Sequence, residues 1–209
     1  ADLGGARLAL LGGDAALSRA LTRWGARPRR YRAGRPADAL LVTGAAPGGL
    51  ASILFSGAVQ RVAWLAPDPP EPAAWEALLP ALGTAAAWAA GPAGAGPAGG
   101  AWLIGGRHPL LDGAGDPGAW WHAEPALLPR YALGSPLPTE LITVCALAGQ
   151  GAPRLATAMG LGHLGEAQLL LCTLPLAEGL AQGLPVAARL LRNIVTWLTA
   201  EPRSPLTRR

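Results

Sequence analysis

Apolar residues in the first half of the chain form short runs that alternate with stretches of helical spacing. Residues 7–11 are an apolar run that ends at two glycines, and Leu17, Leu21 and Trp24 then fall on one side of a helix. The same alternation predicts strands at 29–32, 39–43 and 61–65, with a helix over 48–59. Short strands joined by helices predict an α/β fold, a doubly wound, mostly parallel sheet with helices on both faces.

The pattern changes after residue 82. A helix over 73–82 and a strand over 84–89 are followed by a Gly/Pro surface loop at 91–100, a strand at 101–104 and a long irregular segment at 106–138. Three apolar runs at 141–147, 154–159 and 168–174 predict strands, and the glycines of 160–165 predict an antiparallel hairpin between the last two. Pro185 begins the clearest helix, whose apolar stripe ends at Leu198. We therefore expect one α/β domain over 1–201 and a flexible tail over 202–209.

Composition supports a folded, soluble chain. The 209 residues are 51% apolar and 14% charged, far from the composition of a disordered segment. We expect no membrane span, because no run reaches about 18 apolar residues. No signal-type segment opens the sequence, so the cytoplasm is slightly favoured as the compartment. Cys145 and Cys172 lie in apolar runs, which predicts buried thiols, although they could pair if their strands are neighbours.

Basic residues gather in one short stretch although the net charge is only +4. Five arginines fall within nine residues, at Arg27, Arg29, Arg30, Arg32 and Arg35. They could attract phosphate or an acidic partner, and Arg29, Arg30 and Arg32 are candidate binding residues. The alternative is the exposed face and loop of an edge strand. We do not expect nucleic-acid binding, because Tyr31 is the one aromatic residue within the stretch.

No complete catalytic, cofactor or metal motif is present. Gly12 and Gly13 are adjacent rather than spaced as in a dinucleotide fingerprint, and the carboxylate of Asp14 would repel a pyrophosphate. The three histidines lack partners at metal-ligand spacing. Neither cysteine lies on a strand-to-helix turn. We therefore assign no catalytic residue, no metal and no cofactor.

The most unusual stretch is His108-Pro-Leu-Leu-Asp112-Gly followed by Trp120 and Trp121. Two adjacent tryptophans in a loop cannot point the same way, so one could be buried while the other stacks on a sugar or a partner chain. His108, Asp112, Trp120 and Trp121 are therefore candidate binding residues. The alternative interpretation, which we favour, is that the tryptophans anchor the loop to the core.

The order of ADALLV, RVAWL, HPLLDG, WW, AQLLLCTLPL and ARLLRNIVTWL resembles the glutamine-amidotransferase-like (flavodoxin-like) domain of bacterial β-galactosidase-like glycoside hydrolases. The resemblance spans nearly the whole chain, and its most specific parts are the HPLLDG to WW loop and the LLLCTLPL to RNIVTWL ending. Amidotransferases carry a nucleophilic cysteine on the turn after a central strand. Here RVAWL runs into Ala66, Pro67 and Asp68. The resemblance thus implies a fold without the glutaminase chemistry.

Three functions remain open. The first is a non-catalytic accessory domain that contacts other domains or subunits of a larger carbohydrate-active assembly, or forms a homo-oligomer. The second is a small hydrolase or amidotransferase variant with a pocket near Gly12, Asp14, Gly44 and Asp68, at the carboxyl ends of the strands. The third is a carbohydrate- or anion-binding module that uses the tryptophans or the arginine cluster.

Overall fold

The main element of the fold is one large β-sheet. A computed structural model describes residues 7–13, 15–33, 35, 37–44, 50–67, 89–90, 102–105, 107–133, 141–148 and 155–200. Eight strands form one sheet in the order β2-β1-β3-β4-β10-β9-β8-β6. Their bounds are β1 Arg7–Leu11, β2 Arg27–Arg30, β3 Ala37–Thr43, β4 Val59–Leu65, β6 Trp102–Gly105, β8 Leu141–Ala148, β9 Leu155–Leu164 and β10 Ala167–Cys172.

Parallel and antiparallel strands divide this sheet into two parts. The strands from β2 to β10 pair in parallel, whereas β9, β8 and β6 continue the sheet in antiparallel pairs. The expected α/β class with a mostly parallel sheet is confirmed, as is the antiparallel hairpin in the C-terminal half. Within the described part of the chain, no helix combines the length and the apolar character that crossing a bilayer requires.

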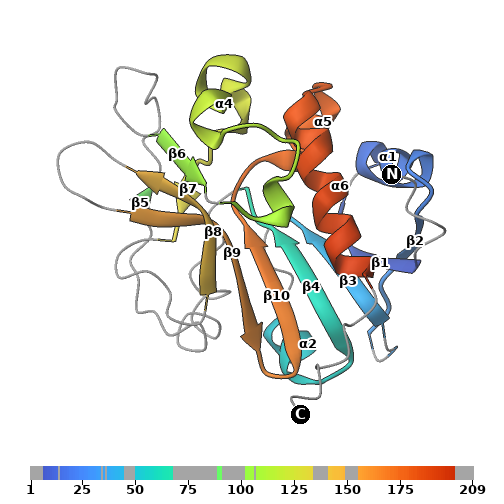
Figure 1. Ribbon diagram of the computed structural model, residues 1–209. Coiled ribbons are helices and arrows are strands. Elements are labelled where there is room, and N and C mark those ends of the chain that lie inside the picture. The colour runs from blue at the N-terminus through green and yellow to red at the C-terminus, as the bar shows by residue number, and fades with distance from the viewer. Residues whose placement is uncertain are drawn as a thin grey trace, which may run out of the picture.

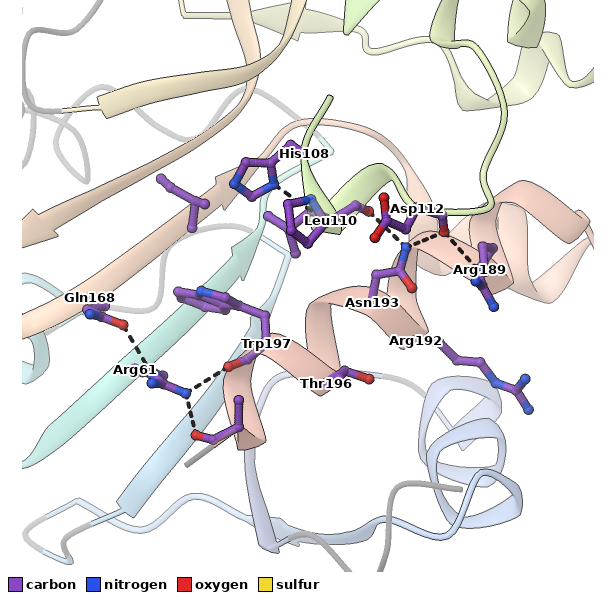
Figure 2. A pocket seen from close by; sticks show the side chains of 13 residues that line it. Arg61, His108, Leu110, Asp112, Gln168, Arg189, Arg192, Asn193, Thr196 and Trp197 are labelled. Carbon is purple, nitrogen blue, oxygen red and sulfur yellow. Dashed lines mark hydrogen bonds between the residues drawn. The ribbon is translucent and has the colours of Figure 1, made fainter. Parts of the chain in front are cut away.

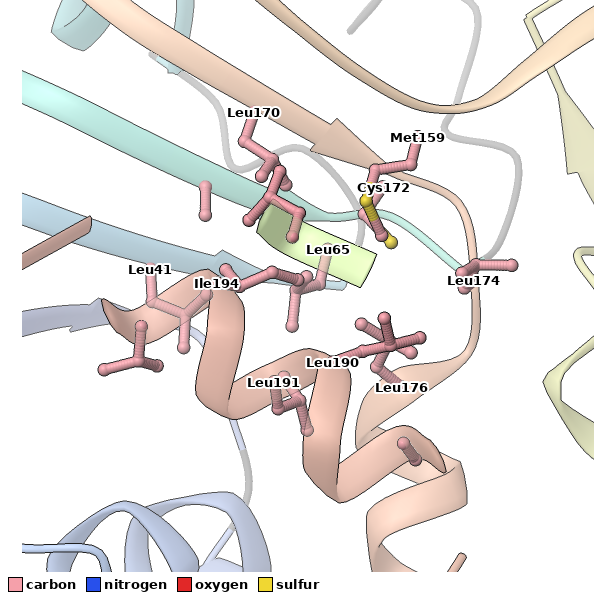
Figure 3. Close-up of a cluster of buried hydrophobic side chains, with 14 of the residues drawn as sticks. Leu41, Leu65, Met159, Leu170, Cys172, Leu174, Leu176, Leu190, Leu191 and Ile194 are labelled. Atoms are coloured by element: carbon pink, nitrogen blue, oxygen red, sulfur yellow. The ribbon is translucent and has the colours of Figure 1, made fainter. Parts of the chain in front are cut away.

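Side chains of the strands alternate between two hydrophobic clusters. Leu41 and Leu65 pack in one cluster with helices α1 (Ala15–Arg23), α5 (Leu176–Ala181) and α6 (Pro185–Thr199), as Figures 1 and 3 show. Leu40 and Trp64 pack in the other with α2 (Leu50–Phe55). The apolar stripe of α6 is fully buried, which matches its sequence pattern. Burial of this stripe holds α6 across the middle of the sheet and leaves the opposite face of the helix free for a site.

Several boundaries differ from those expected from the sequence; β3 and β4, for example, each begin two residues earlier. Helix α2 ends at Phe55 rather than at 59, because Gly57 adopts a φ of 66° that ends the helix, and the β-branched Val59 already belongs to β4. Strand β2 begins two residues earlier than predicted. The hairpin turn lies at Gly165, and β9 continues as a strand through the glycines before it.

The segment 106–138 is more regular than the sequence analysis expected. Within its described part lie the 3-10 turns η3 (Pro109–Leu111) and η4 (Pro125–Leu127), helix α4 (Pro117–Ala123) and the short strand β7 (Tyr131–Ala132). Helix α4 begins at Pro117, and the side chain of Asp116 accepts a hydrogen bond from the amide of Gly118. An N-cap aspartate followed by a first-turn proline is a standard helix start, and the sequence analysis missed it.

Several predictions lie wholly or partly outside the described residues. They are the helix over 73–82, most of the strand over 84–89, the loop at 91–100 and the tail at 202–209. Its last residue, Ala89, lies in β5 (Ala89–Ala90), which pairs with β7 in a separate two-stranded sheet. Helix α5 was not predicted at all.

Candidate functional site

A pocket of about 760 Å³ lies between η3 and the exposed face of α6, with its floor on strands β4, β9 and β10. We call it the η3–α6 pocket. Figure 2 shows the side chains that line it. The polar residues that line it are Arg61, His108, Asp112, Gln168, Arg189, Arg192, Asn193 and Thr196. Its size is typical of a small-molecule site.

His108 has a structural role at the entrance to η3. Its Nδ1 accepts a hydrogen bond from the amide of Leu110, at 3.2 Å, and so caps the turn. Partial burial lowers the pKa of His108, and the charge of Asp112 opposes this shift. His108 is therefore neutral at pH 7. Because its Nδ1 is an acceptor, its proton lies on Nε2 and is available to the pocket.

Two side chains of α6 hold the η3 segment in place. The amide nitrogen of Asn193 donates to the carbonyl oxygens of Leu110 and Asp112, at 3.0 and 2.9 Å. The Nε of Arg189 donates to the same Asp112 carbonyl, at 2.8 Å. Gly113 follows with a φ of 70°, and a Cβ there would lie 2.6 Å from the Arg189 guanidinium. The HPLLDG and RNIVTWL segments, which carry the resemblance most specifically, are thus bonded to each other.

The other end of the pocket contains Arg61, the one charged residue of strand β4. Its Nε donates to Gln168 on the neighbouring strand, at 3.1 Å. Its Nη1 donates to the carbonyl oxygens of Trp197, at 2.9 Å, and Ala200. These carbonyls belong to the last turn of α6 and to its C-cap residue, so Arg61 caps the carboxyl end of the helix and complements its dipole.

Changing Asn193 to Asp is expected to lower the free energy of unfolding by about 2 kcal/mol, because two donated hydrogen bonds are lost and a carboxylate then faces two carbonyls. Urea unfolding followed by circular dichroism measures the loss. Thr196→Ala, at an exposed position one turn along α6, is the control and should change stability by less than about 0.5 kcal/mol. Equal stability of Asn193→Asp and the wild type would contradict this role of Asn193.

Of the candidate binding residues His108, Asp112, Trp120 and Trp121, only the first two are shown to lie in one site. His108 and Asp112 both line the η3–α6 pocket. Trp120 does not: it is 2% exposed, and its indole Nε1–H donates to the carbonyl of Ala114 at 2.8 Å. Trp120 thus anchors the segment to the core and leaves no ring face for a sugar. The tryptophans also lie on α4 rather than in a loop. The side chain of Trp121 lies outside those that the structure describes.

The predicted arginine cluster lies away from this pocket, at the edge of the sheet that β2 forms. Arg29, Arg30 and Arg32 line a hollow of about 690 Å³ with Arg7, Arg35, Tyr31 and Asp38. We call this the β2 basic hollow. Strand β2 is the end strand of the sheet, as one interpretation of the sequence expected. Charged residues and proline on an edge strand also hinder edge-to-edge aggregation, which gives these arginines a structural explanation.

At the carboxyl end of β4, the described side chains fill the space beside the strand. Ala66 follows β4 and is 1% exposed, and the Tyr131 hydroxyl donates to its carbonyl at 2.6 Å. The indole of Trp64 donates to the carbonyl of Gly44, at 3.2 Å. A smaller hollow of about 360 Å³ lies beside Gly12 at the end of β1. Asp14 and Asp68, the two carboxylates suggested for this region, lie outside the described residues.

Both cysteines are free and buried, as the sequence predicted. Their strands are not neighbours: Met159 on β9 pairs with Cys145 on one side and with Cys172 on the other. Figure 3 shows Cys172 beside Met159 in the hydrophobic cluster. Burial raises the pKa of each thiol to about 12. Both thiols are therefore protonated at neutral pH and are poor nucleophiles.

Most of the residues that line the pocket were not predicted from the sequence. Arg61, Gln168, Arg189 and Asn193 were not selected as site residues. Two signals could have found them. Arg61 and Gln168 interrupt apolar runs at paired strand positions, and Asn193 has the one side-chain amide in a helix otherwise made of apolar residues, arginines and threonines.

Among the described residues, no three His, Cys, Asp or Glu side chains gather closely enough to hold a metal ion. The described lining of the η3–α6 pocket therefore holds no such cluster. Compared with models of known protein families the chain matches none, and comparison with curated proteins also finds no match.

Proposed function

We propose that this chain is a non-catalytic accessory domain of the glutamine-amidotransferase-like, doubly wound type. In this role it works within a larger carbohydrate-active enzyme or assembly, where it supports assembly or shapes a neighbouring active site. The observation that carries the proposal is the closed carboxyl end of β4. The resemblance places the amidotransferase nucleophile on the turn after this strand, where the chain has Ala66.

The geometry at Ala66 supports the absence of glutaminase chemistry. Tyr131 is 1% exposed and its hydroxyl binds the Ala66 carbonyl, so a side chain occupies the space that a substrate would need. A nucleophile requires a base within hydrogen-bond reach and an open position beside it. Ala66 supplies no nucleophile.

The two thiols support the same conclusion. An amidotransferase cysteine needs a lowered pKa and access to substrate, whereas burial raises the pKa of Cys145 and Cys172 to about 12. At pH 8 a thiol with that pKa is ionised in only about one molecule in ten thousand. Neither residue meets the requirements of a glutaminase nucleophile.

We therefore expect the folded chain to resist thiol reagents and to lack glutaminase turnover. Incubation with iodoacetamide and with a diazo-ketone analogue of glutamine, followed by mass spectrometry, should give no adduct at Cys145 or Cys172. The same protein in guanidinium chloride is the control, and iodoacetamide should then modify both cysteines. Glutamine hydrolysis and cleavage of nitrophenyl glycosides should stay at the level of buffer. An adduct in the folded protein together with turnover of glutamine would overturn the proposal.

The accessory role itself is tested on the assembly. If the gene, or its neighbour, encodes a carbohydrate-active catalytic domain, that enzyme is prepared with and without this chain. We expect removal of the chain to change the assembly's mass in light scattering or the KM for substrate, with the bond-cleaving chemistry retained. A catalytic domain whose mass, KM and kcat are all unchanged would contradict this part of the proposal.

A further inference from the structure

Two guanidinium groups of α6 are fixed by partners that leave their positive charge uncompensated. Arg189 donates from Nε to the carbonyl of Asp112 at 2.8 Å and lies against Gly113. Arg192 lies over the indole ring of Trp24, 5.0 Å from its centroid. A carbonyl and an aromatic ring orient a guanidinium without neutralising it. Among the described residues, neither arginine forms an ion pair.

Their spacing places the two side chains on one side of the helix. Residues three apart on a helix have Cβ atoms about 5–6 Å apart. Figure 2 shows Arg189 and Arg192 on the same side of α6, at the end of the η3–α6 pocket away from Gln168. Among the described residues, Asp112 is the only acidic one that lines the pocket. Two oriented guanidiniums with free Nη groups are a strong site for a carboxylate or phosphate.

The rest of the pocket offers neutral partners for hydroxyl groups. Asn193 uses its amide nitrogen on η3, so its Oδ1 remains to accept. Gln168 accepts from Arg61 through Oε1, which leaves its Nε2 to donate. The Nε2–H of His108 adds a donor. The exposed Thr196 hydroxyl can both donate and accept a hydrogen bond. Such a set matches a molecule with several hydroxyls.

An apolar surface completes the site. The half-buried ring of Trp197 projects from α6 between His108 and Arg61, as Figure 2 shows, and Leu161 of β9 lies on the floor. Aromatic and aliphatic surfaces pack against the C–H face of a sugar ring, while the neighbouring polar groups bind its hydroxyls. The pocket thus has two arginines at one end, neutral polar groups in the middle, and at the other end the ring of Trp197, over which the Arg61 guanidinium lies 6.0 Å from the centroid.

We propose that the η3–α6 pocket binds an anionic sugar, a ring with several hydroxyls and one phosphate or carboxylate group. The oxyanion lies between Arg189 and Arg192, and the ring extends along Asn193 and Thr196 toward Trp197. This assignment does not depend on the accessory-domain proposal, because a binding pocket of this kind is compatible with either an inert or an active chain. The β2 basic hollow has more arginines but lies on an exposed edge strand, so it serves as the comparison.

Isothermal titration of the whole chain at low salt, with four compounds, tests the proposal. Glucose 6-phosphate and glucuronate carry both features, glucose lacks the charge, and inorganic phosphate lacks the ring. We expect at least one anionic sugar to bind at least about tenfold more tightly than glucose and than inorganic phosphate. Whichever of the two anionic sugars binds more tightly shows whether the pocket prefers a phosphate or a carboxylate. No binding of either anionic sugar at about 10 mM, or equal binding of inorganic phosphate, would overturn the proposal.

Paired double variants locate the site. Arg189→Gln with Arg192→Gln should weaken binding of the preferred sugar at least about tenfold, because both guanidiniums are lost. Arg29→Gln with Arg32→Gln removes the same charge from the β2 basic hollow and should leave the affinity within about twofold. The reverse result would place the anion at the edge strand and overturn the assignment.

A third variant keeps the test decisive if the double variant Arg189→Gln with Arg192→Gln fails to fold. Thr196→Glu changes an exposed position on α6, one turn after Arg192, where a new carboxylate competes with the ligand for the guanidinium. We expect an unchanged melting temperature and an affinity lowered at least about fivefold. Unchanged affinity in this variant would count against the proposed position of the anion.

Discussion

Replacing Gly12 by alanine should lower the free energy of unfolding by about 3 kcal/mol or more. Gly12 has a φ of 78°, and a left-handed backbone costs an alanine about 1–2 kcal/mol. A Cβ at this position would also lie 2.4 Å from the carbonyl oxygen of Thr43, the last residue of β3. Because that oxygen belongs to the backbone of an interior strand, relief of the clash requires the strand to move, at a further cost of about 1–3 kcal/mol.

Gly44 provides a matched control for this effect. Its φ of 85° is similar, but a Cβ there would meet no described atom within 4 Å. Gly44→Ala should therefore cost only the backbone strain, about 1–2 kcal/mol. Urea unfolding of both variants measures the difference. Equal losses would show that the approach of Thr43 does not require a glycine at position 12. The close approach of the Thr43 carbonyl is a sufficient reason for a glycine at position 12, so the residue does not imply a phosphate-binding loop.

The parallel part of the sheet was predictable because its signals are local. The strands at 7–11, 39–43 and 61–65 are apolar runs bounded by turn residues, and the stripe of the last helix repeats at helical spacing. Each signal lies within a few residues of the element that it predicts. The strand order could not be read in the same way: β10 pairs with β4, from which it is separated by about half of the chain.

The segment 106–138 was mispredicted because its elements are short and its stability comes from distant contacts. Helix α4 has seven residues, too few for an apolar stripe to become visible. Trp120 is buried through its place in the core cluster and its bond to Ala114, and the sequence alone predicts neither the cluster nor the bond. The Asp116-Pro117 start was present in the sequence and could have placed the helix.

The site residues also differ in how far they lie along the sequence from the residues that they contact, and this decided which of them could be predicted. His108 and Asp112 are four residues apart, so their unusual sequence context was visible. Asn193 lies about 80 residues from the segment that it holds, and its hydrogen bonds depend on α6 packing beside η3. A polar residue on the exposed face of a helix has no distinctive sequence signal. The structure therefore adds those pocket residues that act across long sequence separations.

The two buried thiols should make the protein lose stability at high pH. In an unfolded chain a thiol ionises with a pKa near 9, whereas burial raises the pKa of Cys145 and Cys172 to about 12 in the folded state. The folded protein thus holds both protons more tightly. The stability that these thiols contribute is complete below pH 9 and is lost as the pH rises from 9 to 12, because the unfolded state ionises first.

Between pH 9 and pH 11 we expect the free energy of unfolding to fall by about 4 kcal/mol from the two thiols together. Urea unfolding at several pH values measures the slope. Cys172→Ala should lower stability at every pH through its cavity but should reduce the slope by about half, since only one buried thiol remains. Met159→Ala is the control: it removes a side chain between the two cysteines, adds no titrating group, and should lower stability while keeping the wild-type slope. If Cys172→Ala kept the full slope, ionisation of the buried thiols would not be the cause of the alkaline loss, because every variant shares the same two tyrosines.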